Sequence, residues 1–205
     1  SGLWRNLTTL KKTKNGWSNN AGLRNPGILK LNRNNVIVSI SLEEESDWAE
    51  IFVFLKENIE KLNIQGIEFN ISCPNHNVSN INKNILEDAY NICKNISIKT
   101  PHDVDIKILE ELAENEMSIL HISNSKKQEN YAISGKSLMY NNLKNISYVK
   151  RKYPNTKVIG GGGIYDLNDL IYYRNAGADY YSLSTALINP YKSYKIIKAY
   201  REIFS

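Results

Sequence analysis

The sequence predicts an α/β fold in which a parallel sheet is wrapped by helices. From residue 35 onward, short β-branched segments alternate with longer helical patterns, in about six successive units. No internal repeat or low-complexity linker interrupts this alternation, so we expect one domain over residues 1–205. A (β/α)8 TIM barrel typically needs about 250 residues. The chain therefore predicts a barrel that is incomplete or abbreviated at its N-terminus.

Hydrophobic periodicity and turn residues give the expected elements in chain order. Strands are expected at residues 36–40, 66–71, 97–99, 118–122, 157–159 and 179–183. Helices are expected at residues 43–62, 86–93, 104–115, 140–152, 166–177 and 194–203. Asp166 is a good N-cap for the fifth of these helices, and Gly177 ends it.

Two segments do not follow the alternation. Residues 1–35 are expected to be a loop-rich remnant of the first barrel units, with a short strand at most at residues 7–10 and loop over 11–33. Residues 123–137 are expected to form a long polar excursion.

Composition excludes several classes of protein. Hydrophobic residues make up 41% and charged residues 23%, as in ordinary globular proteins. The net charge of +5 is compatible with a phosphate-bearing cofactor or RNA, but a solvated lysine-rich surface explains it better. Two cysteines make no disulfide framework, which favours a cytoplasmic location, and with three histidines they show no metal-ligand spacing. No apolar run is long enough for a membrane span.

The most informative stretch is residues 67–75, a buried strand that ends abruptly in a loop containing Pro74. Asn70, Ser72, Cys73 and Asn75 are expected to crowd the carboxyl end of the strand, where α/β folds place ligand sites. A thiol there is a candidate acid, base or nucleophile. The alternative for a single cysteine is a small buried hydrophobe beside a turn.

The second feature is the run of four glycines at residues 160–163, between a strand and a helix. Backbone without side chains lets successive amides approach an anion, and the helix N-terminus adds positive potential. In barrels the loops after the last two strands commonly bind phosphate. Here they contain Gly162-Gly163 and Ser184-Thr185. A plain tight turn explains four glycines about as well.

Taken together, the motifs resemble those of the dihydroorotate dehydrogenases, from about residue 19 to the end. In order they are Asn19–Gly27, Asn70-Ile71-Ser72-Cys73-Pro74-Asn75, Ile98–Pro101, Asn124-Ser125, Ser134-Gly135, Ile159–Ile164 and Ser184-Thr185-Ala186. Cysteine rather than serine in the second motif is similar to the soluble class 1 enzymes, not the membrane-associated class 2.

The resemblance implies an FMN-containing barrel that oxidises dihydroorotate to orotate in de novo pyrimidine biosynthesis. Cys73 would be the catalytic base that takes the C5 proton while hydride leaves C6 for flavin N5. The implied substrate contacts are Asn19, Asn75, Asn124 and Ser125. The implied FMN contacts are Asn70, Lys99, Gly135, Gly162, Gly163, Ser184 and Thr185.

The chain departs from the family pattern at several positions. Lys12-Thr13 would stand for the Lys-Thr pair of the second barrel strand, and only Ser1-Gly2 could stand for the motif of the first. Tyr131 is expected to bring a bulky side chain where backbone usually approaches the cofactor. Ser184 replaces a glycine and is expected to resist a positive φ. The loop after Asn75 is shorter than in the family.

Two other functions stay open. One is a degenerate barrel without catalysis, serving a structural or interaction role. The other is an enzyme similar to the tRNA-dihydrouridine synthases, which also carry an Asn-x-x-Cys-Pro loop on an FMN barrel. A nucleic-acid partner is disfavoured because the net charge is only +5. A homodimer is compatible with the sequence, and the electron acceptor is left open.

Overall fold

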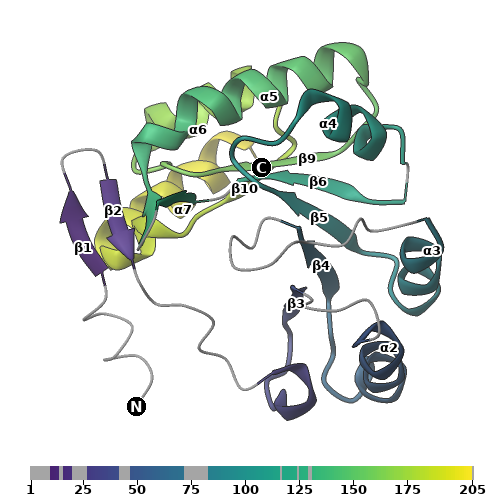
Figure 1. The fold of residues 1–205 in the computed structure, drawn as a ribbon. Coiled ribbons are helices and arrows are strands. Elements are labelled where there is room, and N and C mark those ends of the chain that lie inside the picture. The colour runs from purple at the N-terminus through teal and green to yellow at the C-terminus, as the bar shows by residue number, and fades with distance from the viewer. Residues whose placement is uncertain are drawn as a thin grey trace.

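The structure is a computed structural model (Figure 1). It describes residues 10–13, 16–19, 27–41, 47–71, 83–115, 117–123, 125–128 and 131–204. Within these ranges the chain forms one parallel sheet, one smaller antiparallel sheet and the helices that cover the parallel sheet.

The parallel sheet has six strands in the described part of the chain. They are β3 (Ile37–Ile40), β4 (Gly66–Asn70), β5 (Ile96–Thr100), β6 (Ile119–Ile122), β9 (Val158–Gly161) and β10 (Tyr180–Ser182). Their order in space is β10-β9-β6-β5-β4-β3, and every neighbouring pair is parallel. The sheet curls into a half-barrel. A parallel sheet wrapped by helices is therefore confirmed, while a complete (β/α)8 barrel stays a prediction.

The α-helices connect these strands and lie along the outer side of the curl (Figure 1). They are α2 (Asp47–Asn58), α3 (Lys83–Ile92), α4 (Ile106–Ala113), α5 (Met139–Lys152), α6 (Leu167–Asn175) and α7 (Pro190–Phe204). Short 3-10 turns cover Ile28–Lys30 (η1), Lys136–Leu138 (η2) and Thr185–Ile188 (η3).

The expected helix ends are largely correct. The Asp166 side chain accepts the Asp169 N–H and caps α6, as predicted. Gly177 follows that helix with φ of 101°. Helix α7 begins at Pro190 rather than near residue 194, because proline suits the first turn, where no N–H is needed.

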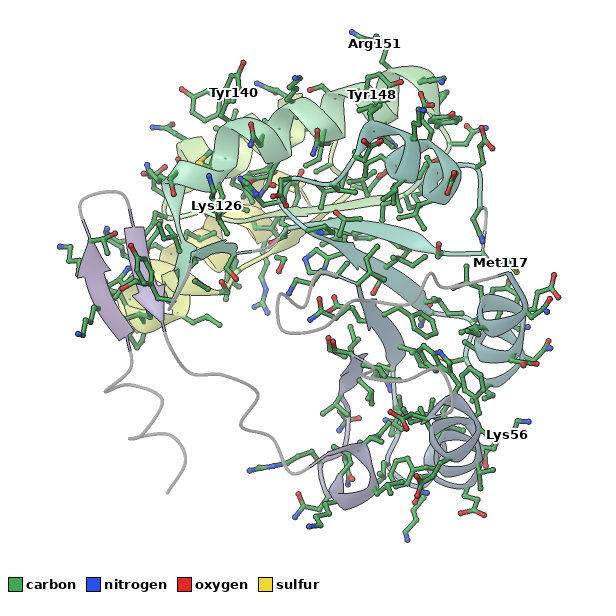
Figure 2. The ribbon with its side chains drawn as sticks, viewed as in Figure 1. Lys56, Met117, Lys126, Tyr140, Tyr148 and Arg151 are labelled. Atoms are coloured by element: carbon green, nitrogen blue, oxygen red, sulfur yellow. The ribbon has the colours of Figure 1, made fainter. Side chains whose placement is uncertain are left out.

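The core lies between the sheet and its helices. The outward side chains of the central strands are each at most 1% exposed, and they are Ile67, Phe69, Ile96, Ile98, Leu120, Ile122 and Val158. Opposite them, Leu55 and Ala89 of α2 and α3 cover one half, and Ile146 and Leu170 of α5 and α6 cover the other. On the far side of α5, Tyr140 is 77% exposed and points away from the sheet (Figure 2).

The prediction of loop over residues 11–33 and 123–137 is wrong in part. β1 (Leu10–Thr13) and β2 (Gly16–Asn19) form an antiparallel hairpin. β2 also pairs with β8 (Tyr131–Ser134), which pairs with β7 (Lys126–Gln128). These strands have only three or four residues each, and the β2–β8 pairing joins segments far apart in sequence, so local periodicity does not mark them.

One local signal could have revealed the hairpin. Asn15-Gly16 is a typical hairpin dipeptide. Gly16 has φ of 144°, and a Cβ on it would lie 2.1 Å from the Ser134 carbonyl oxygen, so only glycine lets β2 approach β8.

The expectation for Lys12-Thr13 is also wrong. Both residues lie on β1, opposite Trp17 and Gly16 of β2, in the antiparallel sheet rather than in a barrel strand. Lys12-Thr13 matches the family motif by residue type, but the pairing of β1 with β2 places these two residues in the antiparallel sheet.

We predict that Ile98→Ala lowers the free energy of unfolding by about 2 to 5 kcal/mol, because it removes a fully buried side chain and leaves a cavity. Ile37→Ala is the matched control on the same sheet, since Ile37 is 65% exposed and should cost about 0.5 kcal/mol or less. Urea unfolding followed by circular dichroism measures both, and equal losses would contradict this assignment of the core.

Candidate active site

Three polar side chains form a row near the carboxyl ends of adjacent strands. Asn70 of β4 is in register with Lys99 of β5, and Lys99 is in register with His121 of β6. Residues in register on parallel strands point to the same face. Because the flanking residues Phe69, Ile98 and Leu120 face the helices, the row lies on the inner, concave face. The structure thus brings two predicted FMN contacts, Asn70 and Lys99, side by side.

A hydrogen-bonded carboxylate–imidazole pair lies beside this row. His121 Nδ1 is 2.6 Å from Glu68 Oε2, and the Ser39 hydroxyl donates to Glu68 Oε1 at 2.8 Å. The exposed fraction is 13% for the Glu68 side chain and 8% for that of His121. The network reaches across β5, so it links β3, β4 and β6 on the concave face.

The Glu68 carboxyl titrates below its usual range. Burial by itself raises its pKa, but the hydrogen bonds with His121 and Ser39 and the electrostatic interactions with His121 and Lys99 together lower the pKa below its ordinary value. Glu68 is therefore ionised at neutral pH and accepts both hydrogen bonds.

The glycine loops come together at the same end of the sheet. Gly162 and Gly163, directly after β9, have φ of 87° and 82°. A Cβ on Gly163 would lie 2.7 Å from the Gly135 carbonyl oxygen, so the two loops touch. Gly135, Gly162 and Gly163, predicted as phosphate contacts, are thus neighbours in space.

Two buried side chains hold the carbonyl groups of this loop. Asn142 Nδ2 donates to the Gly161 oxygen at 2.8 Å. The Tyr173 hydroxyl contacts the carbonyl oxygens of Gly161 and of Gly162, the latter at 2.7 Å. Asn142 and Tyr173 are both 0% exposed, and burial raises the pKa of the Tyr173 phenol, which stays a donor. Fixing these carbonyls fixes the peptide planes whose amides would face an anion.

Beside the loop lies a groove of about 680 Å³. Lys12, Lys136 and Lys192 line it together with Thr185, a predicted FMN contact. Lys136 is 3.0 Å from the buried Asp169 carboxylate, which offsets part of the positive charge. Residues of the β1–β2 hairpin and of α7 line this groove, and Figure 1 shows these two elements next to each other.

The remaining predicted residues are less informative. Cys73, Asn75 and Asn124 lie outside the described residues. Asn19 ends β2 opposite Ala132, away from the parallel sheet by pairing, and its side chain is outside the description. Ser125 is half-buried between β6 and β7.

Two expectations about departures from the family pattern are tested. Ser184 has φ of −130°, so no positive φ is required there and the expected strain is wrong. Tyr131 is 43% exposed on β8, where its side chain has access to solvent.

Sequence reasoning missed His121 and Glu68 of the polar row, and Asn142 and Tyr173 of the glycine loop. A signal for the first pair was present, because charged or polar residues inside buried strand patterns seldom occur without a partner. No signal marked Asn142 and Tyr173, whose contacts depend on how α5 and α6 pack.

No cluster of three or more His, Cys, Asp or Glu side chains among the described residues could hold a metal ion. No helix within the described ranges is both long and apolar enough to cross a membrane.

Fold and site together define an α/β protein whose polar row and glycine loops gather at the carboxyl ends of parallel strands. The chain is 26% identical over 222 residues to the dihydroorotate dehydrogenase B (NAD(+)) catalytic subunit of Malacoplasma penetrans, covering 91% of this chain and 71% of that protein. It is 25% identical over 226 residues to the same subunit of Petrotoga mobilis, covering 94% and 75%. No family model matches the chain.

A crystal structure of DHODH from Eimeria tenella in complex with ferulenol has a similar fold. The TM-score is 0.59 at 16% identity, over 72% of this chain, which spans about half, 52%, of that solved chain. At this identity the likeness concerns the fold alone. With the two curated relatives, it confirms the resemblance to the dihydroorotate dehydrogenases that the motifs predicted.

We predict that the Glu68 network makes stability depend on pH. Because the folded-state pKa of Glu68 is lowered, its contribution is present above the unfolded pKa and is lost as pH falls through the folded pKa. The free energy of unfolding should therefore begin to fall as pH drops below about 5, where the unfolded carboxyl takes up its proton, less steeply in Ser39→Ala and least in Glu68→Gln. Urea titrations at several pH values measure these slopes, and identical slopes in the three proteins would refute the role of the network.

Proposed function

We propose that this protein oxidises dihydroorotate to orotate with FMN, as in de novo pyrimidine biosynthesis. The observation that carries the proposal is the adjacency of Asn70 and Lys99 at the sheet end where Gly135, Gly162 and Gly163 meet. The similarity over most of the chain to two dihydroorotate dehydrogenase catalytic subunits supports the same reaction class.

The residues present fit a flavin phosphate and ring. Successive glycines with positive φ expose backbone amides, which bind a phosphate dianion well. The concave face offers Asn70, the Lys99 ammonium and a buried His121 nitrogen that has no partner among the described residues. We assign the phosphate to Gly135, Gly162, Gly163, Ser184 and Thr185, and the ring to Asn70 and Lys99.

In this proposal the protein supplies orientation and proton transfer. FMN, when bound, would accept the two electrons and the hydrogen from substrate C6. Asn19, Asn75, Asn124 and Ser125 would hold the carboxylate and ring amides of dihydroorotate. Cys73 Sγ, as thiolate, would take the C5 proton, and the C5–H electron pair would form the new C5–C6 double bond.

A non-catalytic barrel is the second candidate. The observation in its favour is the parallel sheet, which has six strands in the described part of the chain, whereas a closed barrel has eight. Under this alternative the fold would keep a structural or interaction role and bind no flavin.

The other expectations from sequence stay part of the proposal. They are a single domain over residues 1–205, a cytoplasmic location, a small-molecule substrate rather than nucleic acid, and a homodimer.

We predict that purified protein binds FMN far more tightly than riboflavin, since the amide cradle acts only on the phosphate. Gly163→Ala should weaken FMN binding and leave riboflavin binding nearly unchanged, because the new Cβ would push against Gly135. Fluorescence titration measures both affinities. Equal affinities in the unmodified protein would show that the glycine run is only a turn.

We predict that Cys73→Ala slows reduction of bound FMN by dihydroorotate about a hundred- to ten-thousand-fold, as expected for loss of a general base. Cys73→Ser keeps a weaker acceptor and should slow it less at high pH. Substrate binding should change little in either variant, because the proton moves only in the transition state.

Single-turnover bleaching of the flavin band measures this rate. If the unmodified protein holds FMN that dihydroorotate never bleaches, the dehydrogenase proposal is wrong. If it holds no FMN, the non-catalytic barrel is favoured.

A further inference from the structure

His121 occupies the same level of the concave face as two proposed flavin contacts. Its Cα partner across the sheet is Lys99, whose partner on the other side is Asn70. The three side chains therefore stand on adjacent strands, about 4.8 Å apart from strand to strand. A planar ring lying against Asn70 and Lys99 would extend to His121.

One nitrogen of His121 has no hydrogen-bond partner in the part of the chain that the structure describes. His121 is 6% exposed, and within the described residues its Nε2 makes no hydrogen bond. Leaving a buried polar atom unpaired is costly, so such atoms commonly indicate a missing ligand or water. Nδ1 is occupied by Glu68, so Nε2 is the atom available to a ligand.

Glu68 determines whether Nε2 of His121 donates or accepts a hydrogen bond. An ionised carboxylate only accepts hydrogen bonds, so the Nδ1 proton points to Glu68. When the ring carries a single proton, Nε2 is then an acceptor with a fixed direction. Ser39 holds the other Glu68 oxygen and limits rotation of the carboxylate.

We propose that His121 contacts the isoalloxazine ring of a bound flavin through Nε2, and that Glu68 is its positioning residue. The proposal rests on the flavin binding proposed above. The pyrimidine edge of that ring presents a carbonyl, an N–H and a second carbonyl in succession. Lys99 supplies only donors, which suit a carbonyl oxygen, and His121 supplies the acceptor that suits the N3–H. Asn70 can serve either kind of group.

The test compares the single variant Glu68→Gln with a double variant that adds His121→Phe. The single variant keeps an acceptor for Nδ1–H. The double variant removes the imidazole nitrogens and, because residue 68 is already glutamine, leaves no carboxylate buried opposite an apolar ring. We expect the single variant to bind FMN within about twofold of the unmodified protein. The double variant should bind both FMN and riboflavin about five- to tenfold more weakly, the loss of one hydrogen bond.

Comparing FMN with riboflavin, which lacks the phosphate, distinguishes a lost contact to the flavin ring from a lost contact to the phosphate. Loss of a ring contact weakens FMN and riboflavin alike and shifts the visible flavin band, whereas damage to the glycine loops weakens FMN alone. Glu68→Leu should also weaken the binding of FMN and of riboflavin, because leucine offers no acceptor to Nδ1–H and leaves the His121 imidazole without its orientation. Glu68→Gln should not weaken binding, because glutamine keeps that acceptor. His121→Asn, which can still bond Glu68 but is too short to reach the position of Nε2, repeats the measurement if the Phe variant unfolds.

The outcomes are distinct. Unchanged binding and spectra in the His121 variants of a protein that binds FMN would overturn the inference and leave the proposed function standing. A loss confined to FMN would also overturn it, because it would place His121 at the phosphate end. An unmodified protein that binds neither FMN nor riboflavin would overturn both. Urea unfolding of each variant confirms that binding is compared between folded proteins.

Discussion

The pleat of the parallel sheet sends alternate side chains to opposite faces, and the rest of the structure depends on this constraint. On β4, Ile67 and Phe69 point outward to α2 and α3, and Glu68 and Asn70 point inward. The outward residues form the apolar core that attaches the helices. The inward residues do not contribute to this core, so they can be polar. Those near the carboxyl ends of the parallel strands lie together at one edge of the sheet.

The polar concave face is unusual for a barrel interior, which is commonly filled by branched apolar side chains. A buried carboxylate is tolerated here because His121, Ser39 and Lys99 stabilise its ionised form. The glycine loop is held in a comparable way, with Asn142 and Tyr173 on its carbonyls. Both sets of contacts fix backbone or side-chain direction before any ligand arrives, which lowers the entropic cost of binding.

Much of the fold follows from local pattern. The strands of the parallel sheet and their helices were predictable because each has its own periodicity and its own stop signals, such as Asp166 and Gly177. The four-stranded antiparallel sheet was not, because β1, β2, β7 and β8 have only three or four residues each and the sheet joins the N-terminal hairpin to a segment more than 100 residues further along the chain. Lys12-Thr13 shows the consequence, because this pair matches a family motif by residue type but lies in the antiparallel sheet instead of on the expected barrel strand.

The sequence by itself determined the chain order of the parallel strands and their helices, the glycine loop and the position of Asn70 near a strand end, because these are properties of neighbouring residues. Only the tertiary structure decided that Glu68 meets His121, which lies 53 residues further along the chain. It also decided that Gly163 lies against Gly135 and that Tyr173 reaches the Gly162 carbonyl. Such contacts depend on strand register and helix packing, which no local pattern encodes, since both are set by burial of the whole apolar face.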